Sequence, residues 1–233
     1  MCGRFALTSP KAAVEALTGA VSAADFPPRY NISPSQMVKA VAEGGERRTI
    51  SDYRFGLTPG FAVESGSPQL IINARAETAA QRPSFSSSLQ RRRCLVPADA
   101  WYEWKALGRF KQPYMIRRHD RNLMTFAGLW ETSIQPDGSE IRALTIMTIA
   151  SGKDVEDIHE RMPAVLAPEY RAAWLDTRVD GASLAMRCLD PAPAGTFETT
   201  AIGSLINRTT NDGPEVQLPA PERSQEPGQP RLI

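Results

Sequence analysis

Cys94–Trp104 reads CLVPADAWYEW, and the run of residues that it opens decides the fold class of the chain. Its two ends, Cys94–Val96 and Ala100–Trp104, are typical of short strands. Strand-like runs follow at Tyr114–Arg117 and Leu123–Trp130 without room for a crossover helix between them. Consecutive strands that lack crossover helices pair as antiparallel neighbours, so the sequence favours an antiparallel, barrel-like α+β fold over a doubly wound one.

The same patterns extend this prediction along the rest of the chain. Three further strands are expected, at Met37–Ala42, Arg48–Phe55 and Arg142–Ile149. Four helices are expected, at Lys11–Leu17, Pro83–Arg92, Pro168–Leu175 and Ala182–Leu189. Ser9 is expected to cap the first of them, with Pro10 at its first position. Strands therefore outnumber helices.

The length and composition of the chain are those of an ordinary globular protein. Its 233 residues are 42% hydrophobic and 23% charged, with a net charge of +1, and suffice for one domain with a sizeable core. This charge excludes a histone-like or polyacidic binder, and no apolar run approaches the ~18 residues of a membrane span. Three scattered cysteines, Cys2, Cys94 and Cys188, lack the pattern of a disulfide framework and indicate a reducing compartment. We therefore expect a cytoplasmic protein that does not bind membranes.

The kind and placement of the basic residues are more informative than their sum. Only five of the 27 basic residues are Lys, and residues 71–121 hold eleven basic side chains against four acidic ones. Arginine binds phosphate through two parallel hydrogen bonds and stacks on bases, so this segment could contact nucleic acid. Codon usage that favours Arg would give the same excess on a solvated surface, and composition leaves both interpretations open.

Cys2 follows the initiator methionine directly, and its small size is compatible with removal of Met1. The processed chain would begin with a 1,2-aminothiol, whose α-amine (pKa about 8) is substantially neutral near pH 7 and can attack a carbonyl. With an aldehyde the amine forms an imine, and the neighbouring sulfur then closes a five-membered thiazolidine ring in a favoured intramolecular step. A cysteine can also stand at position two by chance, and its position alone does not exclude that.

Three more segments carry candidate polar groups. Glu103 shares a strand face with Trp101, where burial would raise its pKa and suit it to general acid–base chemistry, or where it could simply pair with an arginine. Asn73 and Arg75 point the same way as they leave a strand and suggest a polar site at the strand end. His159 lies beside a short acidic helix. The sequence has no CxxC, HxxxH or glycine-rich phosphate loop, so we expect neither a metal nor another cofactor.

Five of these segments occur in an order that resembles a known family. They are Met1–Phe5, Arg29–Gln36, Ile72–Thr78, Cys94–Trp104 and His159–Pro163. The set closely resembles the SOS-response-associated peptidase (SRAP) family, the abasic-site processing proteins, over residues 2–216. The resemblance implies a single SRAP domain with a largely antiparallel barrel-like core and surrounding helices. Composition indicates that the proline-rich tail, residues 217–233, is disordered.

The resemblance also implies a reaction and a set of site residues. The family forms a covalent thiazolidine between its N-terminal cysteine and the ring-opened aldehyde of an abasic site in single-stranded DNA. The residues of this sequence that match the family's motifs are Cys2 as nucleophile, Asn73 as orienting residue, Glu103 as acid–base carboxylate, His159 as active-site histidine, and Arg4 and Arg75 as phosphate-binding residues. Relatives carry one or two tryptophans near the end of the stretch that corresponds to Phe55–Ala62, and Ala62 removes one of those aromatic side chains.

Three functions from different classes follow from these residues. The leading one is a protein that crosslinks abasic sites through Cys2, with associated lyase chemistry, and shields the lesion during a replication-associated damage response. The second is an N-terminal-nucleophile peptidase or amidase in which the Cys2 thiolate attacks an acyl carbon, with removal of Met1 as one cleavage. The third is a non-catalytic single-strand binder. The expected partner is single-stranded DNA with abasic sites, bound by a monomer that is nucleoid-associated when on DNA.

Overall fold

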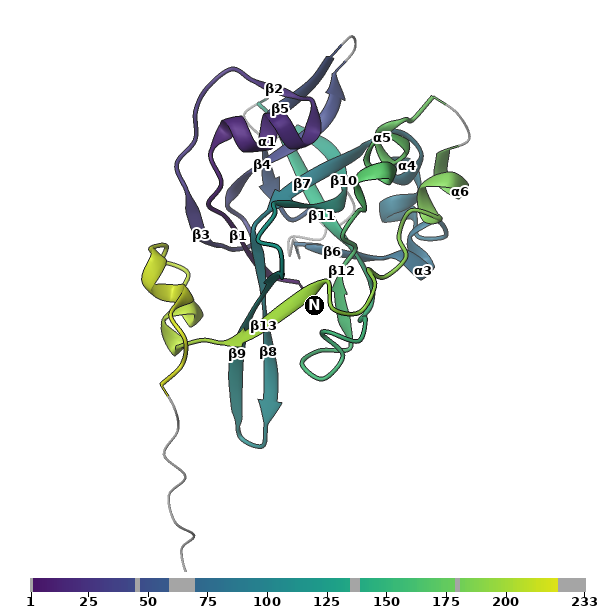
Figure 1. The fold of residues 1–233 in the computed structure, drawn as a ribbon. Coiled ribbons are helices and arrows are strands. Elements are labelled where there is room, and N and C mark those ends of the chain that lie inside the picture. The colour runs from purple at the N-terminus through teal and green to yellow at the C-terminus, as the bar shows by residue number, and fades with distance from the viewer. Residues whose placement is uncertain (1, 45–46, 59–69, 135–138, 179–180, 222–233) are drawn as a thin grey trace, which may run out of the picture.

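The computed structural model describes residues 2–44, 47–58, 70–134, 139–178 and 181–221 (Figure 1). Its strands form two sheets, and helices lie on either side of the larger one. None of the helices in these ranges is long and apolar enough to span a membrane.

Five strands of the larger sheet close into a barrel. They pair in a ring in which four neighbouring pairs are antiparallel and one, β5 with β11, is parallel. The ring consists of β4 (Met37–Gly44), β5 (Arg47–Phe55), β7 (Arg93–Ala98), β10 (Met124–Ile134) and β11 (Glu140–Ala150). Closure removes unpaired edges along this ring.

Three short strands extend the barrel. The first, β2 (Val21–Ser22), pairs with β5, whereas β6 (Asn73–Arg75) and β12 (Arg161–Pro163) both pair with β11. The strand β11 therefore positions the two segments that carry the candidate residues Asn73 and His159.

The second sheet is antiparallel throughout and has the strand order β13-β9-β8-β1-β3. It consists of β1 (Arg4–Leu7), β3 (Arg29–Ile32), β8 (Ala100–Leu107), β9 (Phe110–Arg118) and β13 (Phe197–Ala201). The hairpin of β8 and β9 extends beyond the body of the protein at the lower end of Figure 1. Its two-residue turn contains Gly108 with φ +61°, a conformation that glycine adopts without strain.

The helices are short and lie on two sides of the barrel, α1 apart from the group formed by α4, α5 and α6 (Figure 1). Their bounds are α1 (Lys11–Thr18), α3 (Ala76–Ala79), α4 (Pro83–Arg91), η1 (Pro168–Tyr170), α5 (Arg171–Leu175), α6 (Gly181–Met186), η2 (Ser204–Asn207) and η3 (Pro214–Gln217). The buried guanidinium of Arg93 donates to the carbonyls of Leu89, Trp174 and Asp176, which joins the ends of α4 and α5 to β7.

Two hydrophobic cores lie on opposite faces of β8. The larger core fills the barrel and includes Phe5, whose ring packs edge-on against Phe55 and Phe126, and Trp101, which packs edge-on against Phe126 and Phe197. The smaller core lies beneath η2 and η3 and includes Tyr102, Met115, Ile202, Ile206 and Val216. Alternate residues of β8 thus point into different environments.

The α+β class and the largely antiparallel, barrel-like core predicted from the sequence are confirmed. One detail of the first helix is wrong. Pro10 is the N-cap residue of α1 and not its first helical residue, and the Ser9 hydroxyl donates to Asp99 rather than capping the helix. Because the Asp99 carboxylate also accepts from the backbone N–H groups of Thr8 and Ser9, it takes up the polar groups at this junction.

The structure describes only the start of the tail that was predicted over 217–233. Residues 217–221 are described, and in them Pro219 pairs with Ile202 and the Ala220 N–H donates to the Ala201 carbonyl. Residues 222–233 lie outside the described residues.

Candidate active site

Cys2 precedes β1 and is fully buried in the larger core. Its carbonyl accepts a hydrogen bond of 3.1 Å from the Asn73 side-chain amide, and its sulfur lies 4.0 Å from the Arg4 carbonyl oxygen. Burial, and secondly the negative charge of Glu103, raise the pKa of the Cys2 thiol well above its ordinary value. The thiol is therefore protonated at neutral pH and needs a base before the sulfur can react.

Glu103 is a buried carboxyl group on the barrel-facing side of β8, and its residue is only 2% exposed. Burial raises the pKa of Glu103 to about 7, because a charged carboxylate loses its hydration in the interior. At this value the carboxyl group can both take up and release a proton near neutral pH, as a general acid–base group must.

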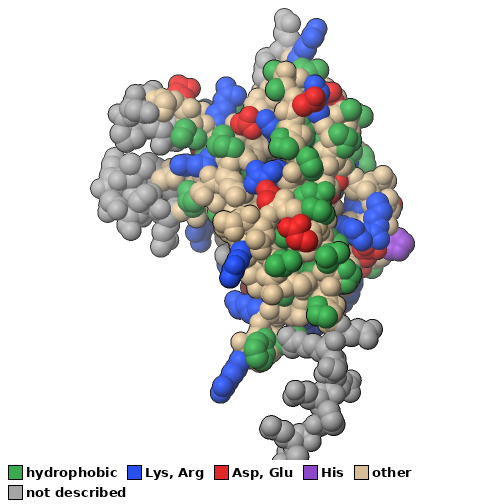
Figure 2. All heavy atoms as spheres, turned by 90° about the vertical axis from the view of Figure 1, so that its left-hand side faces the viewer, with side chains coloured by type: hydrophobic (Ala, Val, Ile, Leu, Met, Phe, Trp, Pro, Cys, Tyr) green, Lys and Arg blue, Asp and Glu red, His purple; other side chains and the backbone are tan. Residues whose placement is uncertain are grey.

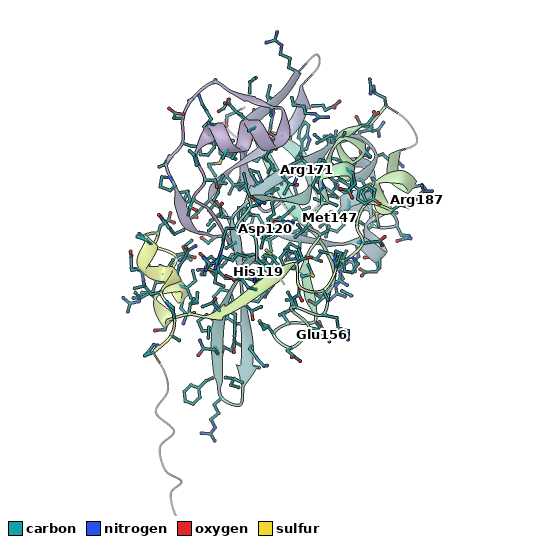
Figure 3. All side chains as sticks on the ribbon, in the orientation of Figure 1. His119, Asp120, Met147, Glu156, Arg171 and Arg187 are labelled. Atoms are coloured by element: carbon teal, nitrogen blue, oxygen red, sulfur yellow. The ribbon has the colours of Figure 1, made fainter. Side chains whose placement is uncertain are left out.

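His159 lies in the segment between β11 and β12 and faces Glu103. Its Nε2 atom is 4.0 Å from the Glu103 carboxylate. Its Nδ1 atom lies 2.9 Å from the backbone nitrogen and 3.1 Å from the carbonyl oxygen of Arg161, so it accepts from the first when unprotonated and donates to the second when protonated. Burial lowers the pKa of His159, so the neutral ring predominates at pH 7. In Figure 3 the label Glu156 shows the loop that also carries His159. The other histidine, His119, lies in the turn after β9.

Asn73 opens β6 and orients the N-terminal segment. Its side-chain amide donates to the Cys2 carbonyl and, at 3.5 Å, to the carbonyl of Ile146 on β11. Because β6 runs parallel to β11 with Asn73 opposite Ile146, the strand register fixes where this amide lies. An amide keeps the same charge at every pH, so Asn73 can hold a reacting group in place without competing for its proton.

Arg161 holds the two sides of the site together, and sequence reasoning did not single it out. Its guanidinium forms two hydrogen bonds to the Glu77 carboxylate, at 2.6 and 2.9 Å, and donates to the Thr148 carbonyl. These contacts join β12 to α3 and β11. The signal was present in the sequence, because Arg161 belongs to the segment His159–Pro163 that contributed to the family resemblance.

The two predicted phosphate-binding arginines differ in their surroundings. Arg75 is exposed at the end of β6, next to the start of α3. Arg4 pairs with Tyr102, and its guanidinium donates to the Asn31 side chain at 2.8 Å and to the carbonyl of Ile206 at 2.7 Å. The structure thus leaves Arg75 open to solvent and gives Arg4 partners within the protein.

The arrangement brings four of the six predicted residues together at one end of the barrel. Cys2 and Asn73 are joined by a hydrogen bond, Glu103 and His159 face each other, and the charge of Glu103 acts on Cys2. Phe61 and Ala62 lie outside the described residues. Within the described ranges, no group of three or more His, Cys, Asp or Glu side chains could hold a metal ion. A thiol, a carboxyl group, an imidazole ring and an amide therefore meet at this point.

The chain is similar to known proteins along most of its length. The profile of the SOS response associated peptidase (SRAP) family matches residues 1–209. The abasic site processing protein YoqW of Bacillus subtilis is 35% identical over 220 residues, which cover 93% of this chain and 98% of YoqW. The abasic site processing protein YedK of Escherichia coli is 31% identical over 226 residues, which cover 94% of this chain and all of YedK.

Solved structures show the same fold. A protein from Bacteroides thetaiotaomicron superposes with a TM-score of 0.81 at 22% identity, over 94% of this chain and all of its own. A phage-related protein from Bordetella bronchiseptica superposes with a TM-score of 0.68 at 30% identity, over 86% of this chain and 94% of its own. Since the family profile covers most of the sequence and relatives above 30% identity cover more than nine-tenths of it, the chain belongs to the SRAP family.

Proposed function

We propose that this chain recognises abasic sites in single-stranded DNA and binds them covalently through Cys2 after Met1 has been removed. The observation that carries the proposal is the meeting of Cys2 with Asn73, Glu103 and His159 at a buried point at the start of the chain. The names of its relatives, abasic site processing proteins, support the choice of lesion.

The proposed reaction uses the α-amine of the processed Cys2 as its first nucleophile. The ring-closed sugar of an abasic site first opens to an aldehyde, for which His159 supplies the proton transfer from Nε2. The neutral amine then adds to the aldehyde carbon to give a carbinolamine, which loses water to become an imine. Glu103 donates the proton that leaves with this water, because its pKa of about 7 keeps much of the carboxyl group protonated at neutral pH.

Ring closure makes the product stable. The Cys2 thiol gives up its proton, the sulfur bonds to the imine carbon, and the imine nitrogen takes a proton to become a secondary amine. The five-membered thiazolidine therefore contains the former aldehyde carbon, and the whole process releases one molecule of water. Closure is intramolecular and needs no second nucleophile to be recruited.

Two further activities belong to the same proposal. The imine intermediate acidifies the neighbouring carbon of the sugar, which permits elimination of the 3′ phosphate and gives lyase activity. Removal of Met1 is a hydrolysis of the Met1–Cys2 peptide bond, and we propose that the site performs it on its own chain. The crosslink would shield the lesion during a damage response linked to replication.

The raised pKa of the Cys2 thiol favours crosslinking over a general peptidase function. An N-terminal-nucleophile peptidase attacks the acyl carbon with a thiolate, and burial disfavours that charged form here. Crosslinking begins instead with the amine, and the sulfur reacts only after the imine has formed next to it.

The test is the intact mass of the processed protein after incubation with a single-stranded oligonucleotide that carries one abasic site. We expect a heat-stable species whose mass is the sum of both molecules less one water. A chain in which Met1 removal is blocked should form no such species, because it has no free 1,2-aminothiol. Turnover of a panel of peptides without any DNA adduct would instead support the peptidase.

A further inference from the structure

The outer end of the β8–β9 hairpin combines exposed apolar side chains with positive charge. Phe110 is 65% exposed, the largest value among the exposed large hydrophobic residues of the described part of the chain, and Leu107 is 42% exposed. Residues 104–113 contain three basic side chains, Lys105, Arg109 and Lys111, and no acidic one. Figure 2 shows hydrophobic and basic side chains side by side at the lower end of the protein, where this hairpin ends.

The strand register places this end on the same face as the candidate active site. Directly opposite residues of an antiparallel pair share a face, and successive residues of one strand alternate between faces. Moving outward along the barrel-facing side, the opposite pairs are Glu103 with Tyr114, Lys105 with Gln112, and Leu107 with Phe110. A basic residue and then two exposed apolar residues therefore continue outward from Glu103.

The spacing fits a strand of nucleic acid that lies along this face. Four residues separate Glu103 from Leu107, or about 14 Å at the rise of an antiparallel strand. A stacked single strand advances about 3.4 Å per nucleotide, so the end of the hairpin lies about four nucleotides from the reacting sugar.

We infer that the outer end of the β8–β9 hairpin is a second contact for the DNA strand that carries the lesion. Phe110 and Leu107 pack on a base to one side of the abasic site, and Lys105 on the same face and Arg109 in the turn attract the phosphates around it. The inference rests on the proposed function, because the lesion at Cys2 sets the position from which the distance is counted.

Charge and area favour nucleic acid over a protein partner. An aromatic side chain among basic residues stacks on any base, which suits a protein that must act without regard to sequence. Two large apolar side chains on a hairpin end cover much less than the ~800 Å² per partner of a stable protein interface. A run of basic residues without an acidic one also opposes docking of a second copy of this chain.

The first experiment compares variants of the full processed chain for binding to undamaged single-stranded DNA of about 20 nucleotides, by fluorescence anisotropy. Phe110→Ala should weaken binding at least about fivefold, the lower end of the effect of losing one base–aromatic stack. Phe110→Trp should bind at least as tightly as the parent protein. The matched control is Val21→Ala, since Val21 is 51% exposed on β2 at the far end of the barrel, and it should leave binding unchanged.

The second experiment measures crosslinking with short oligonucleotides that extend by about six nucleotides from the abasic site to only one side, either 5′ or 3′. At DNA concentrations below saturation, Phe110→Ala should lower the adduct yield with one of the two oligonucleotides and not with the other. At saturation all variants should reach the same yield, because Cys2 and Glu103 are unchanged.

The outcomes separate this inference from the proposed function. If the parent protein crosslinks abasic DNA and Phe110→Ala binds and crosslinks like the parent, the hairpin contact is wrong and the proposed function stands. A dimer of the parent protein that Phe110→Ala dissociates, seen by light scattering, would make the hairpin a protein interface and overturn the inference. If the parent neither binds nor crosslinks DNA, both proposals fail.

Discussion

Tyr102 and Glu103 are neighbours on β8, both buried and both polar, yet their surroundings differ. The Tyr102 hydroxyl donates to the Tyr30 carbonyl at 2.6 Å and accepts from the Gln217 side chain at 2.8 Å, within the smaller core. Glu103 points to the opposite face, where His159 lies 4.0 Å away and burial raises its pKa to about 7. We call the face of β8 that carries Tyr102 the closed face and the face that carries Glu103 the reactive face.

The difference indicates how structure and chemistry are divided in this fold. On the closed face, hydrogen bonds to the chain's own backbone and C-terminal segment take up the polar groups, which stabilises the packing of η2 and η3. On the reactive face, the carboxyl group titrates near neutral pH and faces an ionisable ring. Substitutions on the closed face should therefore change stability and leave rates nearly unchanged, whereas those on the reactive face should change rates, together with the pH dependence of stability where they remove the titrating group.

The largest expected effect is that of Glu103→Gln on crosslinking. Gln cannot donate and accept a proton in turn, so the rate of adduct formation should fall about 10²- to 10⁴-fold. The loss should persist on a substrate whose aldehyde is already open, because Glu103 serves the amine step. The measurement is a time course of adduct on a denaturing gel, and a loss below tenfold would remove Glu103 from the proton transfer.

The same substitution should make the protein more stable at and above neutral pH. The folded protein holds the Glu103 proton up to about pH 7, whereas the unfolded chain releases it near pH 4.5, so this group's contribution is fully present below pH 4.5 and is lost as pH rises through 7. The shift corresponds to on the order of 3 kcal/mol. Denaturant unfolding at pH 5 and pH 8 should show a gain for Glu103→Gln over the parent at pH 8 and a smaller one at pH 5. An equal difference at both pH values would contradict the raised pKa.

His159→Ala should have a smaller effect, and one that depends on the substrate. If Nε2 of His159 mainly opens the sugar, the rate should fall tenfold or more on a natural abasic site and much less on a pre-opened aldehyde. Release of a preformed crosslink should slow as well, because reopening the thiazolidine needs a similar proton transfer. The control is Glu103→Gln on both substrates. Equal losses for both variants on both substrates would mean that the two residues act as one coupled pair.

Tyr102→Phe tests the closed face. The substitution leaves the Tyr30 carbonyl and the Gln217 amide without their partner, so the free energy of unfolding should fall by about 1–3 kcal/mol. The rate of crosslinking should stay within about twofold of the parent, far from the ~10²-fold loss that marks an acid–base group. Denaturant unfolding and the adduct time course measure the two effects. A variant as stable as the parent but slow to crosslink would contradict the division between the faces.

The smallest expected effect concerns Arg4 and Arg75, which we propose as phosphate contacts. For each, substitution by Ala should weaken binding to single strands of any sequence and reduce the salt slope by about 0.7 per lost contact. Arg4→Ala should in addition lower stability, because its guanidinium binds Asn31 and the Ile206 carbonyl on the closed face. Titration of an undamaged oligonucleotide at several salt concentrations gives the slopes. An unchanged slope with reduced crosslinking would assign the arginine to the chemistry instead.

The sequence predicts the long strands of this fold well, and the structure explains why the short strands and the closure of the barrel could not be predicted. Strands β7, β8, β10 and β11 have strong local patterns and were expected. The short strands β1, β3 and β6 have three or four residues each, too few for a periodic pattern. The longer strands β8 and β11 lie beside β1 and β6, and β3 pairs in turn with β1. The parallel pairing of β5 with β11 that closes the barrel joins residues far apart in the chain, which no local pattern reveals.

The candidate site was predictable in its residues but not in its geometry. Glu103 stood out because it alternates with aromatic residues on a strand, and the thiol chemistry of Cys2 follows from its position. That Asn73 binds the Cys2 carbonyl depends on the register of β6 with β11, which spacing in the sequence does not determine. The hydrogen bond of Arg4 to the Ile206 carbonyl in η2 was missed because the two residues are about 200 positions apart in the chain.

The measurement that tests the central claim most directly is the structure of the crosslink itself. The oligonucleotide carries ¹³C at the C1′ position of the abasic site, and the adduct is examined by NMR and by tandem mass spectrometry after proteolysis. We predict a tetrahedral C1′ carbon bonded to both the nitrogen and the sulfur of an N-terminal Cys2, with one water lost and no change on borohydride treatment. An adduct on a lysine, an adduct on a chain that retains Met1, or an imine that borohydride reduces would contradict the account.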